Sequence, residues 1–234
     1  MPTPPMPTYT AAQVHEAEAP FLARGVPLMH RAAAALARES EALLGGRTGG
    51  VAGVRILVLA GAGNNGADAL YAADLLAEQG AALCILPTST RVHREALEAV
   101  LARGADLRPV GEPADVVAAL ARSADLILDG ILGTGTSDSP ALRGPAHDTV
   151  AAILPVLDPG HPPLVVAVDL PSGIGVDDGS VPDATVLRAD LTVTFGGCKA
   201  GLLKHPAAAY AGRVVVADIG IADELERIRR RDLG

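Results

Sequence analysis

A short glycine-rich stretch carries the side chains with the clearest potential to bind a ligand. It is GAGNNGAD over residues 61–68, and it directly follows an apolar, β-branched segment at 54–60. Glycine allows a sharp turn and a close approach to a ligand, and N–H groups at the start of a following helix favour an anion. Asn64, Asn65 and Asp68 add amide and carboxylate oxygens. The stretch indicates either a ligand-binding loop or a plain glycine turn within a βα unit.

The spacing of Gly61, Gly63 and Gly66 fits the dinucleotide-binding fingerprint G-x-G-x-x-G, but its context does not. That fingerprint expects an acidic residue roughly 20 positions further on, at the end of the second strand, where it binds a ribose. Here the second expected strand, at 81–86, is followed by Pro-Thr-Ser. The sequence therefore does not support an ordinary dinucleotide turn.

Polar residues also follow the later strands that we expect. They are Asp129 after 124–128, Asp169 and Ser172 after 164–168, Lys199 after 190–195, and Asp218 after 213–217. A single acid at a strand end is more often a helix cap or a loop anchor than a catalytic group. However, ligands bind beyond the carboxyl ends of the strands in an open α/β sheet. Several such residues on one edge favour a binding site there.

Two kinds of ligand suit these residues. Asn65, Asp129 and Ser172 offer the oxygen atoms that hard cations take, and backbone carbonyls can complete a potassium shell. A polar hydrogen-bond network is the alternative, and the residues alone favour it. The stretch GTGTSDS at 133–139 is suited to cradling a phosphate, or is a surface loop. Lys199 is suited to pairing with a phosphate or carboxylate, or is solvated.

The segments that would position these residues alternate between strands and helices. Besides the strands above we expect one at 106–109, and helices at 68–79, 91–103, 113–122, 145–154 and 222–231. This alternation predicts βαβ units and a mostly parallel sheet. Two helices should precede it. Thr10 and Gln13 form a capping box for the first, which Pro20 should end near Ala19; the second should span 27–44, before a glycine-rich connector at 45–53.

Composition limits the possible functions. The 234 residues suit a single domain over 10–234, preceded by a proline-rich, loosely attached tail at 1–9. The net charge of −8 and an aromatic content of 2% argue against nucleic-acid binding. No apolar stretch is long enough to span a membrane and no signal peptide is evident, so we expect a cytoplasmic protein. His15, His30 and His93 fall on expected helices and suggest ordinary surface residues.

The assembled motifs resemble the YjeF N-terminal domain family, the NAD(P)H-hydrate epimerases, over nearly the whole chain. In order, they are YTAAQVHEAE, GVPLMHRAAAALA, GAGNNGADAL, DLILDGILGTG, VDLPSGIGVDDG, TVTFGGCKAGLL and AGRVVVADIGI. The resemblance implies a Rossmann-like three-layer α/β/α sandwich, usually homodimeric. It implies interconversion of the R and S hydrates of NADH and NADPH (NADHX and NADPHX) at nicotinamide C6. A separate ADP- or ATP-dependent dehydratase would then consume the S form.

The resemblance also implies which residues form the site. Substrate contacts would fall on Asn64, Asn65, Gly66, Ala67, Asp68, Gly133, Thr134, Gly135, Thr136, Ser137, Asp138, Ser139 and Asp169. A potassium ion would fall on Asn65, Asp129 and Ser172. Epimerisation needs a general acid–base. We expect Asp169 in that role, with Asp68 and Lys199 as alternatives.

Two features depart from the family pattern. Ala67 stands where the family has the second glycine of NNGGD, and its methyl group could crowd the ligand or forbid a positive φ. The second loop, GTGTSDSPALRG, is longer and more polar than usual, which leaves the contacts of 136–139 open. The alternative function is a non-catalytic nucleotide- or protein-binding module of the same fold. Retention of Asn65, Asp129, Asp169 and Ser172 together favours the enzyme.

Overall fold

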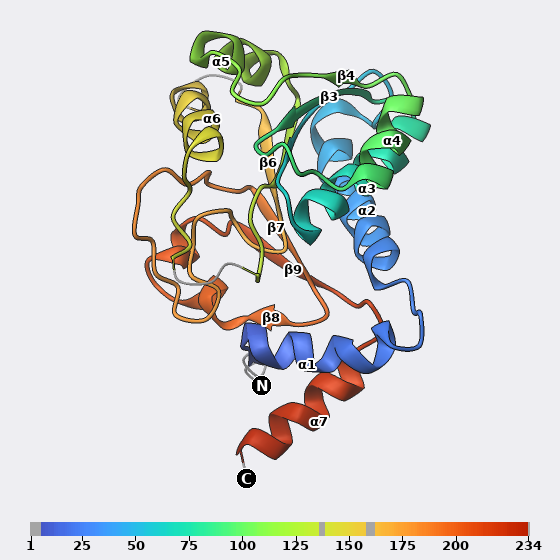
Figure 1. Cartoon of the computed structure of the whole chain (residues 1–234), viewed down its shortest axis with the longest axis vertical. Coiled ribbons are helices and arrows are strands. Elements are labelled where there is room, and N and C mark those ends of the chain that lie inside the picture. Colours follow the sequence, from blue (N-terminus) through green and yellow to red (C-terminus); the bar gives the residue numbers. More distant parts are fainter. Residues whose placement is uncertain (1–5, 136–138, 158–161, 234) are drawn as a thin grey trace.

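A parallel β-sheet forms the centre of the computed structural model, which describes residues 6–135, 139–157 and 162–233 (Figure 1). Its order is β4 (Asp106–Leu107), β3 (Ala82–Pro87), β2 (Arg55–Ala60), β5 (Leu126–Gly130), β6 (Leu164–Val168), β7 (Leu191–Phe195) and β9 (Arg213–Ala217). Each neighbouring pair in this seven-stranded sheet is parallel. The expected sheet and its seven strands are therefore confirmed.

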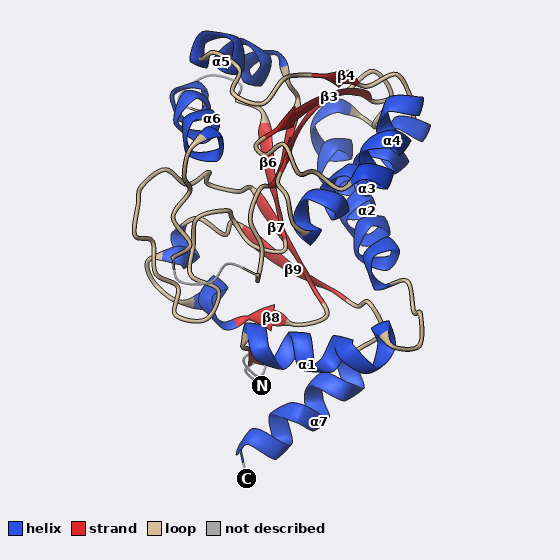
Figure 2. Cartoon of the chain, viewed as in Figure 1, coloured by secondary structure: helices blue, strands red, loops and turns tan. Residues whose placement is uncertain are grey.

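Helices cover both faces of the sheet. α2 (Leu28–Thr48), α3 (Asn64–Glu78) and α4 (Arg94–Ala102) lie on one face, and α5 (Ala114–Ser123) and α6 (Pro145–Ile153) lie on the other (Figure 2). Alternate residues of β2 enter separate cores: Ile56 and Val58 pack on the α2–α3 side, whereas Leu57 and Leu59 pack on the α5–α6 side. A strand buried on both faces requires a continuous apolar segment, which explains the sequence at 54–60. The three-layer α/β/α architecture is thus confirmed.

The sheet reverses its order of connection at β2, which lies between β3 and β5. The chain leaves β2 toward β3 on one side, while β5 and the later strands extend on the other. Such a switch point opens a crevice at the carboxyl ends of the two central strands. Here the Gly61 N–H donates to Gly130 O at 3.0 Å, and Asn65 Nδ2 donates to Leu132 O at 3.1 Å. The loops after β2 and β5 thus face each other across the crevice.

The N-terminal and C-terminal segments meet at one end of the sheet (Figure 1). β1 (Thr8–Tyr9) pairs in parallel with β8 (Cys198–Lys199), and α1 (Ala11–Leu22) packs beside α7 (Ala222–Leu233). The expectation of a loose tail over 1–9 is wrong for Thr8 and Tyr9, because their backbone is paired and Tyr9 is buried. Residues 1–5 lie outside the described part of the chain.

The start of α1 was predicted, but its end was not. Thr10 and Gln13 form the expected capping box, with Gln13 N to Thr10 Oγ1 at 3.2 Å and Thr10 N to Gln13 Oε1 at 3.0 Å. The helix nevertheless continues past Pro20 to Leu22. Proline removes one N–H donor but leaves the following bonds available, and Ala23 N still donates to Ala19 O at 3.0 Å. One missing bond in the last turn is therefore tolerated.

Two other boundaries differ in ways that matter. α2 runs through Gly45 and Gly46, which were expected in a connector, and ends at Gly49 in a left-handed conformation with φ 77°. α3 begins at Asn64, four residues before the expected start, so the asparagines lie in its first turn.

Short 3₁₀ helices at Leu154–Val156, Ala200–Leu203 and Ala207–Ala209 were not expected. Within the described residues, none of the helices has the length and apolar character needed to cross a membrane.

The contact between the β2 and β5 loops gives a test of the fold. A Cβ atom on Gly61 would lie 1.9 Å from Ile131 O, whereas one on Gly45 in α2 would meet nothing within 4 Å. We expect Gly61→Ala to lower the free energy of unfolding by about 1–3 kcal/mol because the backbone must move. The matched Gly45→Ala should raise it by about 0.5–1 kcal/mol through helix propensity. Urea unfolding measures both, and equal stabilisation by both variants would contradict the close approach.

Candidate functional site

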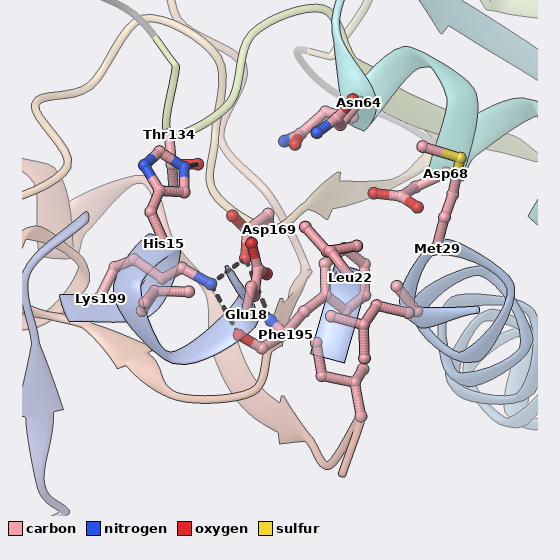
Figure 3. A pocket seen from close by; sticks show the side chains of 15 residues that line it. His15, Glu18, Leu22, Met29, Asn64, Asp68, Thr134, Asp169, Phe195 and Lys199 are labelled. Carbon is pink, nitrogen blue, oxygen red and sulfur yellow. Dashed lines mark hydrogen bonds and ion pairs between the residues drawn. The ribbon is translucent and has the colours of Figure 1, made fainter. Parts of the chain in front are cut away.

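A cavity of about 120 Å³ lies where α1 and α2 approach the carboxyl ends of the central strands (Figure 3). Apolar side chains of the two helices, including Leu22 and Met29, form one wall. Polar side chains from α3 and from the strand ends form the rest. Figure 3 labels Asn64, Asp68, Thr134, Asp169 and Lys199 among them, together with His15, Glu18 and Phe195. Residues that follow different strands therefore meet at one rim of the sheet, as the sequence predicted.

Asp169 and Lys199 form a buried ion pair in this cavity. Lys199 Nζ lies 2.5 Å from Asp169 Oδ1, and the two residues are 1% and 4% exposed, with lysine the more buried. Thr194 Oγ1 and the Phe195 N–H also donate to Oδ1, each at 3.0 Å. Lys199 makes a further bond to Phe195 O at 2.8 Å (Figure 3). Three donors at one oxygen stabilise a negative charge on Asp169.

The backbone at Asp169 aims its side chain into the cavity. Asp169 has φ 67°, and the Leu170 N–H donates to Val168 O at 2.8 Å, which closes a three-residue turn at the end of β6. Positive φ is uncommon outside glycine, although aspartate and asparagine adopt it more readily than other residues. It is the only non-glycine residue with positive φ in the described ranges. Strain of this kind is found at functional positions.

Lys199 reaches the pair from β8, which is fixed by the N-terminal segment. Tyr9 of β1 lies in register with Lys199, and Thr8 lies in register with Cys198. A fully buried lysine requires a partner for its charge, and Asp169 supplies it. The expectation that Lys199 could pair with a carboxylate is therefore confirmed, and the alternative of a solvated lysine is wrong.

Asp68 faces the same cavity from α3 with a different environment. It is 6% exposed, and its Oδ1 has no hydrogen-bond partner among the described residues. Burial raises the pKa of the Asp68 carboxyl well above its usual range, and the charges of Asp169 and Glu18 raise it further, while Lys199 lowers it. Asp68 therefore keeps its proton to a higher pH than an ordinary aspartate.

Two polar residues of α1 line the cavity, and sequence reasoning did not assign either of them to a site. Glu18 lies beside Asp169, and His15 Nε2 lies 3.1 Å from Thr134 Oγ1 (Figure 3). Partial burial raises the pKa of Glu18, and Asp169 adds to this, whereas Lys199 and His15 oppose it. The helical periodicity of α1 could have indicated that Glu18 faces the interior. Val14, Ala17 and Glu18 share one face, and the first two are core residues.

The residues expected to hold a cation lie together behind the cavity. The Ser172 N–H donates to Asp129 Oδ2 at 2.9 Å, and Ser172 Oγ lies 2.9 Å from the Leu132 N–H. Asn65 Nδ2 donates to Leu132 O at 3.1 Å and to Val168 O at 2.5 Å. Burial raises the pKa of Asp129, and hydrogen bonds from Ser172 and Ile131 oppose that shift. The described residues contain no group of three His, Cys, Asp or Glu side chains that could hold a metal.

A second cavity, of about 370 Å³, adjoins the first and shares four of its residues. The shared residues are His15, Asn64, Asn65 and Thr134. Its other walls are the Ala62–Gly63 turn and the loop from Ile131 to Gly135. A Cβ on Gly133 would lie 2.3 Å from Asn65 Oδ1, so glycine is needed for this approach. Gly63, the N-cap of α3, makes no side-chain capping bond. The first-turn N–H groups of a helix favour an anion.

Not every expected contact residue lines these cavities. Gly66 packs against Gly61, where a Cβ would meet Gly61 O at 2.3 Å, and Ala67 is fully buried in the core. The methyl of Ala67 therefore lines neither cavity, and this residue has no positive φ. Ser139 lines neither cavity, and its Oγ accepts from the Ala141 N–H at 3.4 Å. Thr136, Ser137 and Asp138 lie outside the described residues.

Known proteins are similar to this chain in sequence and in fold. A protein named NAD(P)H-hydrate epimerase from Clavibacter sepedonicus is 51% identical over 216 residues, which are 91% of this chain and 90% of that protein. A Bifunctional NAD(P)H-hydrate repair enzyme Nnr from Mycobacterium tuberculosis (strain ATCC 25618 / H37Rv) is 42% identical over 217 residues, covering 91% of this chain and 41% of that protein. The crystal structure of yeast ynu0 matches 84% of this chain and 83% of its own with a TM-score of 0.69 at 20% identity, which supports the fold.

A family match covers the central part of the chain and, apart from Ile219, the residues of both cavities that follow α1. The family described as YjeF-related protein N-terminus matches residues 25–201. This range begins before α2 and ends just after Lys199. Together with the close relatives, it shows that the chain belongs to the YjeF-related N-terminus family.

Proposed function

We propose that this protein is an isomerase that interconverts the R and S forms of hydrated NADH and NADPH. The observation that carries the proposal is the pairing of unlike carboxyl groups in one cavity. Asp169 has three donors at one oxygen, whereas Asp68 has an oxygen with no partner and a raised pKa. Opposed environments of this kind separate an acid from a base. The names of relatives at about half identity agree with this activity.

The two groups would act on the hydroxyl group at nicotinamide C6. Protonated Asp68 donates its proton as the C6–O bond breaks, so that water leaves and the ring nitrogen helps to carry the positive charge. Water then adds to the opposite face, and its surplus proton passes to Asp169. A proton then returns from Asp169 to Asp68 through solvent, which restores the starting protonation states, so no net proton is consumed. The reverse direction follows the same steps backwards. Proton transfer by positioned groups typically contributes about 10²–10⁴-fold to a rate.

The cavity walls suit the nicotinamide end of the substrate. Leu22 and Met29 offer an apolar surface to the ring, and Glu18, Asp68 and Asp169 line the same cavity (Figure 3). The uncapped start of α3 and the loop at Gly133–Gly135 would receive the phosphates. The contacts expected for Gly66 and Ala67 would then be indirect, because both pack away from the cavities.

The residues behind the cavity fit a potassium ion. The buried Asp129 carboxylate has no salt-bridge partner within the described residues, and Leu132 O and Val168 O lie close to Asn65. One carboxylate with hydroxyl, amide and backbone oxygens is a suitable donor set for a hard monovalent ion. Asn65 would turn its amide so that Oδ1 takes the place of Nδ2. A bound ion would supply positive charge that compensates Asp129 and fixes the loops after β5 and β6.

The remaining parts of the proposal concern partners. The chain would act in the cytoplasm as a homodimer and supply the S form to a separate ADP- or ATP-dependent dehydratase. The name of the bifunctional relatives agrees with a link between epimerisation and a further repair step. The test supplies mixed NADHX epimers and an S-specific dehydratase, and follows NADH formation. With this protein, consumption should proceed to completion. A non-catalytic binding module would leave the R form untouched, and that outcome would overturn the proposal.

Asp169→Asn tests the proposed base. Asparagine also adopts positive φ, so the turn can persist while the carboxylate is lost. We expect the epimerase rate to fall by about 100-fold or more. Asp115→Asn on the exposed face of α5 is the matched control and should keep the full rate. Thermal unfolding of both variants checks that the loss does not come from unfolding, and a full rate with Asp169→Asn would exclude Asp169.

The raised pKa of Asp68 predicts opposite effects on activity and stability. Because the pKa is higher in the folded chain, this group's contribution to stability is present below the unfolded pKa of about 3.9 and is lost as pH rises through the folded value. Asp68→Asn cannot ionise, so the variant does not lose this contribution to stability as the pH rises. We therefore expect an unfolding temperature at neutral pH that is equal or higher, with an epimerase rate at least about 100-fold lower.

The pH profile gives the matching readout. The wild-type rate should fall as pH rises through the pKa of Asp68, and this limb should be missing from the residual activity of Asp68→Asn. If the rate of Asp68→Asn still falls over the same pH range, the fall belongs to the titration of another group.

A further inference from the structure

The two adjoining cavities have opposite electrostatic character. The first contains Glu18, Asp68 and Asp169 with a single lysine, which Asp169 already engages. The second has no carboxylate among its described lining residues, and His15 is the only one of these residues that can carry a charge. We therefore expect a diphosphate to enter the second cavity, which has no carboxylate among its described lining residues, rather than the first. The charge distribution thus fixes which end of a dinucleotide enters which cavity.

His15 lies at the boundary between them. It lines both cavities, and its Nε2 contacts Thr134 Oγ1 at 3.1 Å across the crevice from the start of α3. The ring is exposed, so a ligand can reach it. Asn64, which also lines both cavities, begins α3 on the other side.

α1 holds His15 at this place through contacts on both flanks. Val14 and Ala17 are buried in the core, and Glu16 pairs with both terminal nitrogens of Arg231 on α7. At the start of the helix, the Ala11 N–H donates to Asp177 Oδ1 at 2.8 Å. A ring on a helix fixed in this way loses little conformational freedom when it binds a ligand.

We propose that His15 binds the diphosphate bridge of the substrate, with its Nε2–H donated to a phosphate oxygen in place of the present contact with Thr134. The inference rests on the proposed function and adds a binding residue to it. His15 precedes residue 25, where the family match begins, so the match itself does not assign this role. The neighbouring N–H groups of α3 have no side-chain cap and receive the same anion. The unpartnered oxygen of buried Asp68 marks the adjoining cavity as the place of the other end of the ligand.

The test compares His15→Ala with His15→Lys in the epimerase assay, with His147→Ala on α6 as the control. His147 is a partly exposed histidine that lines neither cavity. We expect His15→Ala to raise KM for NADHX by about tenfold, the loss typical of a hydrogen bond to a charged group, while kcat changes little. His15→Lys supplies another hydrogen-bond donor at this place, and should recover most of the affinity. His147→Ala should match the wild type.

Inorganic pyrophosphate, used as a competitive inhibitor, locates the contact. Its inhibition constant should rise in His15→Ala by a factor similar to that of KM, and it should recover in His15→Lys. An unchanged inhibition constant together with a raised KM would show that His15 acts only by holding Thr134, and would overturn the proposal. An unchanged KM would overturn it as well. If the wild-type protein has no epimerase activity, the proposed function fails. If the wild type is active and His15→Ala has the same KM and kcat, only the role of His15 is removed.

Discussion

One buried ion pair, between Lys199 and Asp169, connects the parts of the protein that form the cavity. Asp169 follows β6, and Lys199 belongs to β8, which the N-terminal β1 holds in register. Removing one member of a buried pair typically costs about 3–5 kcal/mol because the other charge is left without compensation. The pair therefore constrains the β6 turn and the N-terminal segment at once. It also uses the one lysine of the cavity, which leaves Asp68 without a positive partner.

This arrangement explains how one small cavity holds carboxyl groups of different character. Asp169 is surrounded by donors, Asp68 is buried with an unpaired oxygen, and Glu18 is only partly buried. A carboxyl group left without partners destabilises the folded chain when it ionises. Such a group is retained where a ligand completes its hydrogen bonds. The unpaired carboxyl group lies at the carboxyl ends of the strands, where α1 and α2 cover it, and the core behind it consists mainly of Ala, Val, Leu and Ile.

The sequence predicted the sheet because most of its strands, such as β2 and β3, are apolar segments next to glycine or proline, and these patterns depend on local residues alone. It also predicted that Asn65, Asp129 and Ser172 would meet, because parallel strands end at one edge. It missed the start of α3, since Asn-Asn-Gly is a poor helix former and is helical here through tertiary packing. It missed the role of α1, because nothing local shows that residues 8–9 pair with 198–199. The direction of Asn65, which donates to two carbonyls, also depends on contacts with distant residues.

The pairing of β1 with β8 has a consequence for synthesis. Thr8 and Tyr9 leave the ribosome early, but their partners follow roughly 190 residues later, and α7, which supports α1, comes last. The central strands β2, β3 and β5 can associate while translation continues, since they are closer in the chain. Closing a very long loop is slow relative to local pairing. The nascent chain thus carries an open half-site until β8 and α7 have emerged, and only then can α1 be fixed beside the cavity.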